Sequence, residues 1–127
     1  MPAWIWIAVA GAAGSVCRHL VGLAAEKWLG TGLPWGTFAV NAVGSLLLGF
    51  VMAAITRNPD WPPAIRLAVC TGFLGAFTTF STFSVDTVKL LQDGRSLAAL
   101  GNVAANVGVG VLLALVGFTL AQRVWAA

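Results

Sequence analysis

The sequence predicts an all-α membrane protein with four transmembrane helices. Of its 127 residues, 59% are apolar and 9% are charged, whereas about a quarter of the residues in a soluble domain carry charge. A helix needs about 20 apolar residues to cross a hydrocarbon core, and four stretches are long enough: residues 3–25, 33–56, 64–91 and 97–122. Because the connectors are short, we expect a single transmembrane domain over residues 1–127, with no soluble catalytic domain and no enzyme activity.

The first span is expected to remain in the protein as a helix. A secretory signal peptide begins with basic residues ahead of its apolar run, but the first charge here is Arg18, late in the span. The long side chain of Arg18 can reach the headgroup region. Glu26 lies toward the end of the span and is expected at the interface. Cys17 and Cys70 fall inside apolar spans as small hydrophobic residues, so no disulfide, metal or redox role is expected.

The second and fourth spans carry small and polar residues at four-residue intervals, which places them on one face of a helix. Such stripes pack transmembrane helices together and bond across their interfaces. For the amides, interhelical hydrogen bonding is favoured over ligand contact unless another feature indicates a pore. The stripes consist of Asn41, Ser45 and Gly49 in the second span, and of Asn102, Asn106, Gly110 and Ala114 in the fourth.

The third span predicts a helix break between residues 75 and 79, near the middle of the membrane. Five hydroxyl residues crowd into positions 78–84, directly after Gly72 and Gly75, and glycine and threonine are poor helix formers. A broken helix at this depth is tolerated only where it is buried in protein or lines a cavity. The alternative is that the two glycines merely allow close helix packing.

A break would free backbone carbonyls, such as those of Gly75 and Thr78, and freed carbonyls coordinate cations in transporters and channels. In a two-fold dimer, two carbonyls from each chain could meet one ion on the axis. Beside the break, Phe80 and Phe83 lie three residues apart on one face. Aromatic ring edges are positive and can solvate an anion. Hydroxyl donors interleave with the rings, at Ser81, Thr82 and Ser84.

The basic residues are balanced between the two sides of the membrane. One side receives Arg57, Arg66 and Arg123, and the other receives Lys27, Lys89 and Arg95. Orientation follows the imbalance of Lys and Arg, so a balanced chain can insert both ways, and an antiparallel homodimer is the simplest closed assembly. Accidental balance among few charges is an equally weighted alternative. In a membrane protein the net charge of +3 reports orientation, and we expect no nucleic-acid partner.

The third span also resembles a known family, the CrcB/Fluc fluoride channels. Residues 75–84, Gly-Ala-Phe-Thr-Thr-Phe-Ser-Thr-Phe-Ser, are similar to the family's third-helix signature, Gly-x-x-Thr/Ser-Thr-Phe-Ser-Thr-Phe-Ser. Weaker matches are Gly14 with Arg18 in the first span, and residues 36–41 with Gly44 in the second. The similarity covers the whole chain in the number, length and order of its spans.

This resemblance implies a dual-topology antiparallel homodimer in the bacterial inner membrane, with two pores through which fluoride leaves the cytoplasm passively. It also implies a structural sodium ion on the dimer axis, held by the main-chain carbonyls of Gly75 and Thr78. Arg18 would lie at a vestibule. The implied pore residues are the asparagine Asn41, the anion-facing rings of Phe80 and Phe83, and a hydroxyl track of Ser81, Thr82 and Ser84.

Two positions depart from the family pattern. Asp86 stands where members often carry glutamate, and Gly110 stands where some carry a pore serine. We hypothesise that Asn106, one turn earlier, replaces that serine in the pore.

Two other functions compete with the channel. A small proton-coupled multidrug exporter of dual topology shares the four spans, but it needs a carboxylate embedded in its first helix, and Glu26 comes too late. A non-transporting membrane subunit would explain the composition but not the hydroxyl-rich break.

Overall fold

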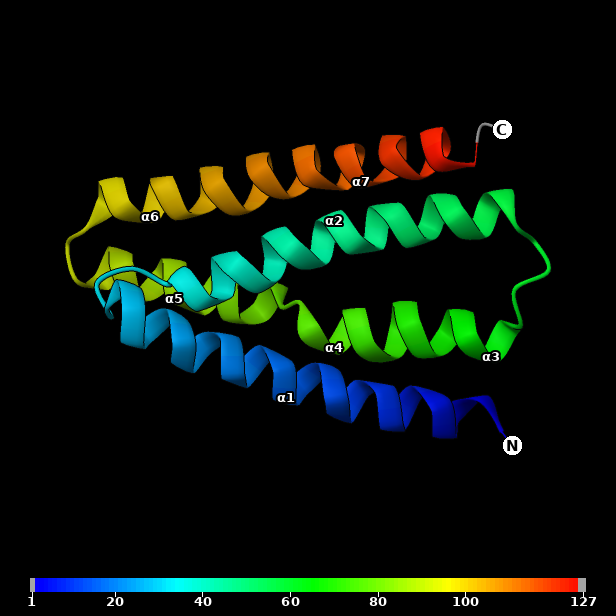
Figure 1. The fold of residues 1–127 in the computed structure, drawn as a ribbon. Coiled ribbons are helices and arrows are strands. Elements are labelled where there is room, and N and C mark those ends of the chain that lie inside the picture. The colour runs from blue at the N-terminus through cyan, green and yellow to red at the C-terminus, as the bar shows by residue number, and fades with distance from the viewer. Residues whose placement is uncertain (1, 126–127) are drawn as a thin grey trace.

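The computed structural model describes residues 2–125, which form a bundle of four antiparallel helical spans (Figure 1). All four are long and apolar enough to cross a membrane, as predicted. The first two are continuous helices, α1 (Ala3–Leu29) and α2 (Trp35–Arg57). The third span, Pro63–Gln92, comprises α3 (Pro63–Arg66), the π-helical stretch η1 (Leu67–Leu74), α4 (Gly75–Phe77) and α5 (Phe80–Gln92). The fourth comprises α6 (Ser96–Ala104), the π-helical stretch η2 (Ala105–Val109) and α7 (Gly110–Val124).

The span ends differ from the predicted ranges by a few residues. Helix α1 continues past the predicted end at residue 25 to Leu29, because Glu26 and Lys27 are compatible with a helix. It ends at Gly30, whose φ of 78° is readily adopted only by glycine. Helix α2 begins at Trp35 and not at residue 33, because Pro34 has a non-helical ψ of 59°.

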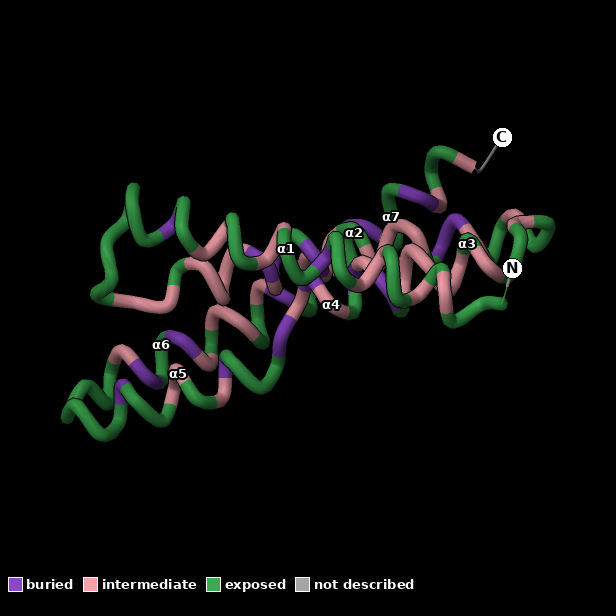
Figure 2. The backbone as a smooth tube through the Cα atoms, turned by 90° about the horizontal axis from the view of Figure 1, so that it is seen from below, coloured by how far each residue is buried: buried purple, intermediate pink, exposed green. Residues whose placement is uncertain are grey.

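The predicted break in the third span is confirmed. Thr78 and Thr79 are extended, with ψ of 160° and 114° respectively, and they separate α4 from α5. Residues 75–77 stay helical, so the break occupies the second part of the predicted range. Figure 1 shows the link between α4 and α5 about halfway along the bundle. Figure 2 shows α5 and α6 running together and diverging from the connector between α1 and α2.

Away from the region where α5 and α6 diverge, close backbone contacts at glycines hold the spans together. Helix α2 lies along α7, where a Cβ added at Gly49 would collide with the backbone of Ala114 and one at Gly117 with that of Leu46. Helix α1 lies along η1 in the same way, with Gly14 against the backbone of Phe73. Small residues at crossings are the usual means of packing helices in lipid. The two predicted stripes meet at Gly49 and Ala114, so at this crossing they act as packing faces.

Candidate functional site

A cavity of about 240 Å³ lies beside the break. It is lined by α2, the broken segment, the start of α5 and η2, it is open on one side, and every residue that lines it is uncharged. The lining residues are Asn41, Gly44, Ser45, Leu48, Thr78, Thr79, Phe80, Phe83, Asn106 and Val107. We call this the break cavity. Four of the predicted pore residues meet in it: Asn41, Phe80, Phe83 and Asn106.

Asn41 replaces the helical hydrogen bonding that the break removes. Its Oδ1 accepts the backbone N–H of Thr79 at 2.8 Å, and its Nδ2 donates to the backbone carbonyl of Thr79 at 3.1 Å. Thr79 is only 8% exposed, and unpaired backbone groups are costly in an apolar environment. The amide of Asn41 therefore stabilises the extended conformation of Thr79 by pairing with both of its polar groups.

A chain of amides continues from Asn41 into the fourth span. Nδ2 of Asn41 also donates to Oδ1 of Asn106 at 2.9 Å, and Nδ2 of Asn106 donates to Oδ1 of Asn102 at 3.0 Å. Asn102 is 8% exposed and donates through its own Nδ2 to Oγ1 of Thr87 at 2.9 Å. The hydroxyl of Thr87 donates in turn to the carbonyl of Phe83 at 2.9 Å. This amide chain thus joins the break to α5 through the fourth span.

The two predicted anion-facing rings form a tilted pair, with centroids 5.4 Å apart and ring planes at 56°. Phe83 is buried, at 7% exposure, whereas Phe80 is 77% exposed. A tilted pair directs ring edges as well as faces into the space around it, and the edges carry the positive part of the ring quadrupole. The exposed ring of Phe80 lies on the outer surface of the single chain.

The predicted hydroxyl track is divided between different surroundings. Thr79 caps α5, since its Oγ1 accepts the N–H of Thr82 at 3.2 Å and donates to the Thr82 hydroxyl at 3.0 Å. Ser81 and Thr82 are exposed, and Ser84 donates to the carbonyl of Phe80 at 2.9 Å. Within one chain, Ser81, Thr82 and Ser84 do not line the break cavity with the rings.

The predicted cation ligands lie at the break. Thr79 donates its N–H to Asn41, so the Gly75 carbonyl lacks the donor that a continuous α-helix would supply four residues later. Gly75 is exposed on the single chain. The Thr78 carbonyl accepts a hydrogen bond from Nη1 of Arg18 at 3.4 Å, near the long limit for such a bond. Arg18, predicted at a vestibule, therefore reaches back to the break.

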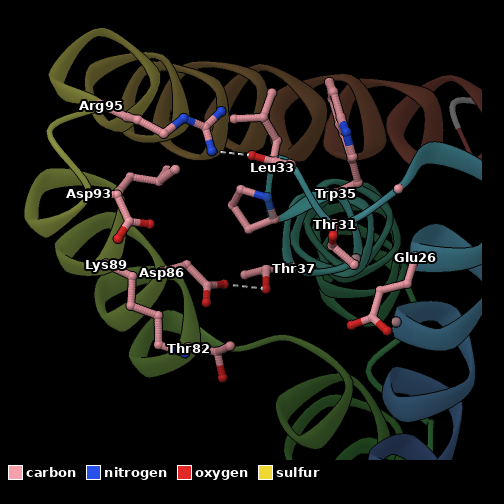
Figure 3. A pocket seen from close by; sticks show the side chains of 16 residues that line it. Glu26, Thr31, Leu33, Trp35, Thr37, Thr82, Asp86, Lys89, Asp93 and Arg95 are labelled. Carbon is pink, nitrogen blue, oxygen red and sulfur yellow. Dashed lines mark hydrogen bonds between the residues drawn. The ribbon is translucent and has the colours of Figure 1, made fainter.

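A polar cleft lies on the other side of α5 and leads toward the connector ends. Its outer part, of about 430 Å³, includes Glu26, Lys89 and Asp93 (Figure 3). Its inner part, of about 450 Å³, includes Arg18 and reaches Thr79. Thr37 and Thr82 line both parts, so Thr82 faces this cleft. Thr79 lines both this cleft and the break cavity, and so it lies between a cleft with charged residues and a cavity without them.

Two hydrogen bonds brace the walls of the polar cleft. Oγ1 of Thr37 on α2 donates to Oδ2 of Asp86 on α5 at 2.8 Å (Figure 3). Nη1 of Arg95, just before α6, donates to the carbonyl of Gly32 in the first connector at 2.6 Å. These contacts tie α5 to α2 and the start of α6 to the first connector.

A family model described as "CrcB-like protein, Camphor Resistance (CrcB)" matches residues 5–118. The chain belongs to the CrcB family. It is 46% identical to a protein of Syntrophotalea carbinolica over 94% of this chain and 97% of the relative. It is 44% identical to one of Deinococcus radiodurans, over 96% and 97%, and 37% identical to one of Acidobacterium capsulatum, over 97% and 98%. All three relatives are named fluoride-specific ion channel FluC.

Membership in the CrcB family confirms the resemblance found in the sequence. The relatives are named ion channels and not enzymes, which agrees with the expectation of a non-enzymatic protein. They come from bacteria, and the four apolar spans make this chain a multi-pass membrane protein of a bacterial family. The CrcB match extends over the break, the break cavity and the polar cleft, since all of these lie between residues 5 and 118.

Sequence reasoning missed four residues that hold this CrcB site together. Thr79 was seen only as part of the break, Asn102 only as a packing residue, and Thr37 and Thr87 received no role of their own. Spacing carried a signal for Thr37, which precedes Asn41 by four residues and so extends the polar stripe of α2. The bond between Thr87 and Asn102 joins two spans, so it required knowledge of how the helices pack.

Proposed function

We propose that this chain is the subunit of a fluoride-selective channel that lets fluoride leave the cytoplasm passively across the bacterial inner membrane. The observation that carries the proposal is the similarity, across nearly the whole chain, to relatives named fluoride-specific ion channels. The break cavity supports the proposal, because an asparagine amide and two phenylalanine rings line the same uncharged pocket. The channel would lower the fluoride concentration in the cell and so reduce its toxicity.

The chemistry of the break cavity suits a small and strongly hydrated anion. Such an ion leaves water only where donors replace its hydration shell. Asn41 supplies an amide group, Ser45 supplies a hydroxyl, and Phe80 and Phe83 supply ring edges. No fixed cation lines the cavity. Neutral donors bind the anion weakly enough for it to leave again, and conduction requires that release.

The proposed assembly is an antiparallel homodimer with two pores. The exposure of Phe80, at 77%, supports it, because a ring assigned to a pore needs a further wall that one chain does not provide. The exposure of Gly75 at the break supports it as well. The three-to-three balance of the basic residues other than Arg18 favours no orientation. Ser81, Thr82 and Ser84 would meet the pathway in this dimer, on surfaces that one chain leaves open.

A structural sodium ion on the dimer axis is the final part of the proposal. Sodium is a hard cation that prefers oxygen ligands, and the Gly75 carbonyl has lost its helical donor. The Thr78 carbonyl has two lone pairs, of which the long contact from Arg18 uses at most one. Gly75 and Thr78 of both chains would therefore hold the ion, which would join the two breaks through its attraction to carbonyl oxygens.

Fluoride flux from liposomes tests the function. Purified protein is reconstituted into liposomes that contain fluoride and chloride, the membrane potential is short-circuited with a potassium ionophore, and ion-selective electrodes follow both anions. We expect fluoride to leave rapidly while chloride stays inside. Equal release of both anions, or no fluoride release from liposomes shown to contain dimers, would contradict the proposal. Proton-dependent export of an organic cation without fluoride flux would instead support the exporter considered above.

Cysteine labelling tests the dual topology. A single cysteine is placed at the exposed residue Thr31, in a chain in which Cys17 and Cys70 are serine, and intact cells are treated with a thiol reagent that cannot cross the membrane. We expect about half of the protein to be labelled from outside, since both orientations are equally favoured. Complete labelling, or none before the cells are opened, would show a single orientation.

A further inference from the structure

The amide of Asn41 has no free donor in the single chain. An asparagine amide has two N–H groups, and those of Asn41 donate to the carbonyl of Thr79 and to Oδ1 of Asn106. A fluoride ion that takes a hydrogen bond from Asn41 must therefore displace one of these two acceptors.

Backbone groups fix the direction of these bonds. The Thr79 N–H can only donate and its carbonyl can only accept, so Asn41 must turn its Oδ1 to the former and its Nδ2 to the latter. Asn106 must then present an oxygen to Asn41. Its Nδ2 lies 3.0 Å from the backbone carbonyl of Asn102, which can only accept. Asn106 must therefore point its Oδ1 at Asn41 and its Nδ2 at Asn102, because its contacts with both residues require this orientation.

We infer that Asn106 is an internal acceptor that competes with the permeating anion for the amide of Asn41. Its Oδ1 carries the partial negative charge of a carbonyl and holds the place that a dehydrated anion takes in the break cavity. This inference rests on the proposed fluoride channel function. It assigns Asn106 an effect opposite to that of a fluoride ligand: in its present orientation, Asn106 opposes anion binding at Asn41.

Of the two acceptors, Asn106 is the one that yields. The Thr79 carbonyl belongs to the backbone of the break, and the same residue is bound to Asn41 through its N–H. Moving this carbonyl away from Asn41 would also strain the bond from the Thr79 N–H, because both groups belong to one residue of the backbone. Asn106 is held on a half-buried surface of the π-helical stretch η2. Its amide can turn away about its side-chain torsions while the backbone stays in place.

Asn102 and Thr87 are positioning residues for this competition. Oδ1 of Asn102 accepts a hydrogen bond from Asn106, and Asn102 is held in that orientation because its Nδ2 donates to Thr87. Thr87 must accept there, since its own hydrogen is donated to the carbonyl of Phe83. Removing the Thr87 hydroxyl would free Asn102 to turn, and Asn106 would then yield to the anion at a lower cost.

The concentration dependence of fluoride efflux tests the inference. The half-saturating fluoride concentration is measured in liposomes for the wild type, Asn106→Leu, the milder Asn106→Ser, and Thr87→Val. Serine at position 106 can donate to the carbonyl four residues earlier, but it is too short to take the place of the amide oxygen. Thr56→Val is the matched control for Thr87→Val, because Thr56 also donates to the carbonyl four residues earlier but binds no amide.

We expect both Asn106 variants to lower the half-saturating concentration about threefold to tenfold, the range that corresponds to one net hydrogen bond. Thr87→Val should lower it less, and Thr56→Val should leave it at the wild-type value.

A higher half-saturating concentration in Asn106→Ser would overturn the inference and make Asn106 a fluoride ligand, and an unchanged value would also overturn it. If Asn106→Leu fails to assemble, Asn106→Ser and Thr87→Val decide in the same way. Absence of flux in the wild type would instead contradict the proposed function itself.

Discussion

The two halves of the third span are held by different kinds of contact. Before the break, η1 packs directly on α1, where Gly14 meets the backbone of Phe73 and a Cβ at Gly72 would come within 2.9 Å of Ala10 and Ile7. After the break, α5 is tied to its neighbours by polar side chains: Thr37 binds Asp86, and Asn102 binds Thr87. The break itself is held by Asn41.

This difference in contacts indicates that the two halves of the third span have different roles. Contacts between backbone atoms at glycines leave no space for an ion and cannot rearrange without separating the helices. A hydrogen bond contributes only about 0.5–1.5 kcal/mol net, so an anion can exchange with it. In the proposed channel the first half would therefore serve as a fixed support, and the second half would present groups that an anion displaces one at a time. Changes on either side of the break should accordingly have different effects.

The largest effect is expected from filling a backbone contact in the first half. In Gly14→Leu the new side chain would collide with the Phe73 backbone, which cannot move without shifting η1. Overpacking of this kind costs about 1–3 kcal/mol even where side chains can adjust. We expect little assembled protein by gel filtration. The control is Gly101→Ala on α6, where a Cβ meets nothing within 4 Å. Normal assembly of Gly14→Leu would contradict the close packing of α1 on η1.

A second, smaller effect is expected at the aromatic rings of the second half. Phe80→Ile and Phe83→Ile remove ring edges from the break cavity but keep apolar volume. Each should slow fluoride efflux about tenfold, which corresponds to about 1.4 kcal/mol in the barrier. The matched control is Phe73→Ile in the first half, where Phe73 and Phe77 stack at 5.9 Å with planes at 10°. If all three variants slowed efflux equally, the two rings after the break would have no role beyond that of other phenylalanines.

The smallest effect is expected in the polar cleft. Thr37→Val removes the hydrogen bond to Asp86 and leaves its half-buried carboxyl group without this donor. We expect assembled dimers with a stability lower by about 1 kcal/mol and a fluoride efflux reduced less than by the ring variants. Thermal unfolding followed by light scattering and liposome flux check the two effects. Thr119→Val, at an exposed hydroxyl of α7, is the control. Abolished flux would show that the cleft, and not the break cavity, limits conduction.

The four spans and the break could be predicted from the sequence because both are local properties. Apolar length sets the spans, and the run of glycine and threonine residues disfavours a helix around Thr78 and Thr79. The span ends were less accurate because single residues set them: Pro34 delays α2, and Gly30 ends α1.

The predicted pore residues were only partly brought together in one chain. Asn41, Asn106, Phe80 and Phe83 share the break cavity, since helical spacing places each on a facing surface. Whether each amide of the chain from Asn41 to Thr87 donates or accepts depends on the backbone groups that the two ends of the chain contact. The packing between spans determines which backbone groups these are, and the sequence of one span alone does not predict that packing. The family resemblance assigns Ser81, Thr82 and Ser84 to a hydroxyl track, and in the single chain helix α5 places them outside the break cavity.

The initial rate of fluoride efflux from assembled Asn41→Leu dimers, relative to the wild type, tests most directly whether the break is the element that handles the ion. Leucine keeps a similar volume but leaves the N–H of Thr79 without its acceptor and removes the amide donor from the break cavity. We predict that wild-type dimers empty the liposomes of fluoride while the variant retains it, with chloride retained by both. Wild-type fluoride efflux in the variant would contradict a channel built around this break.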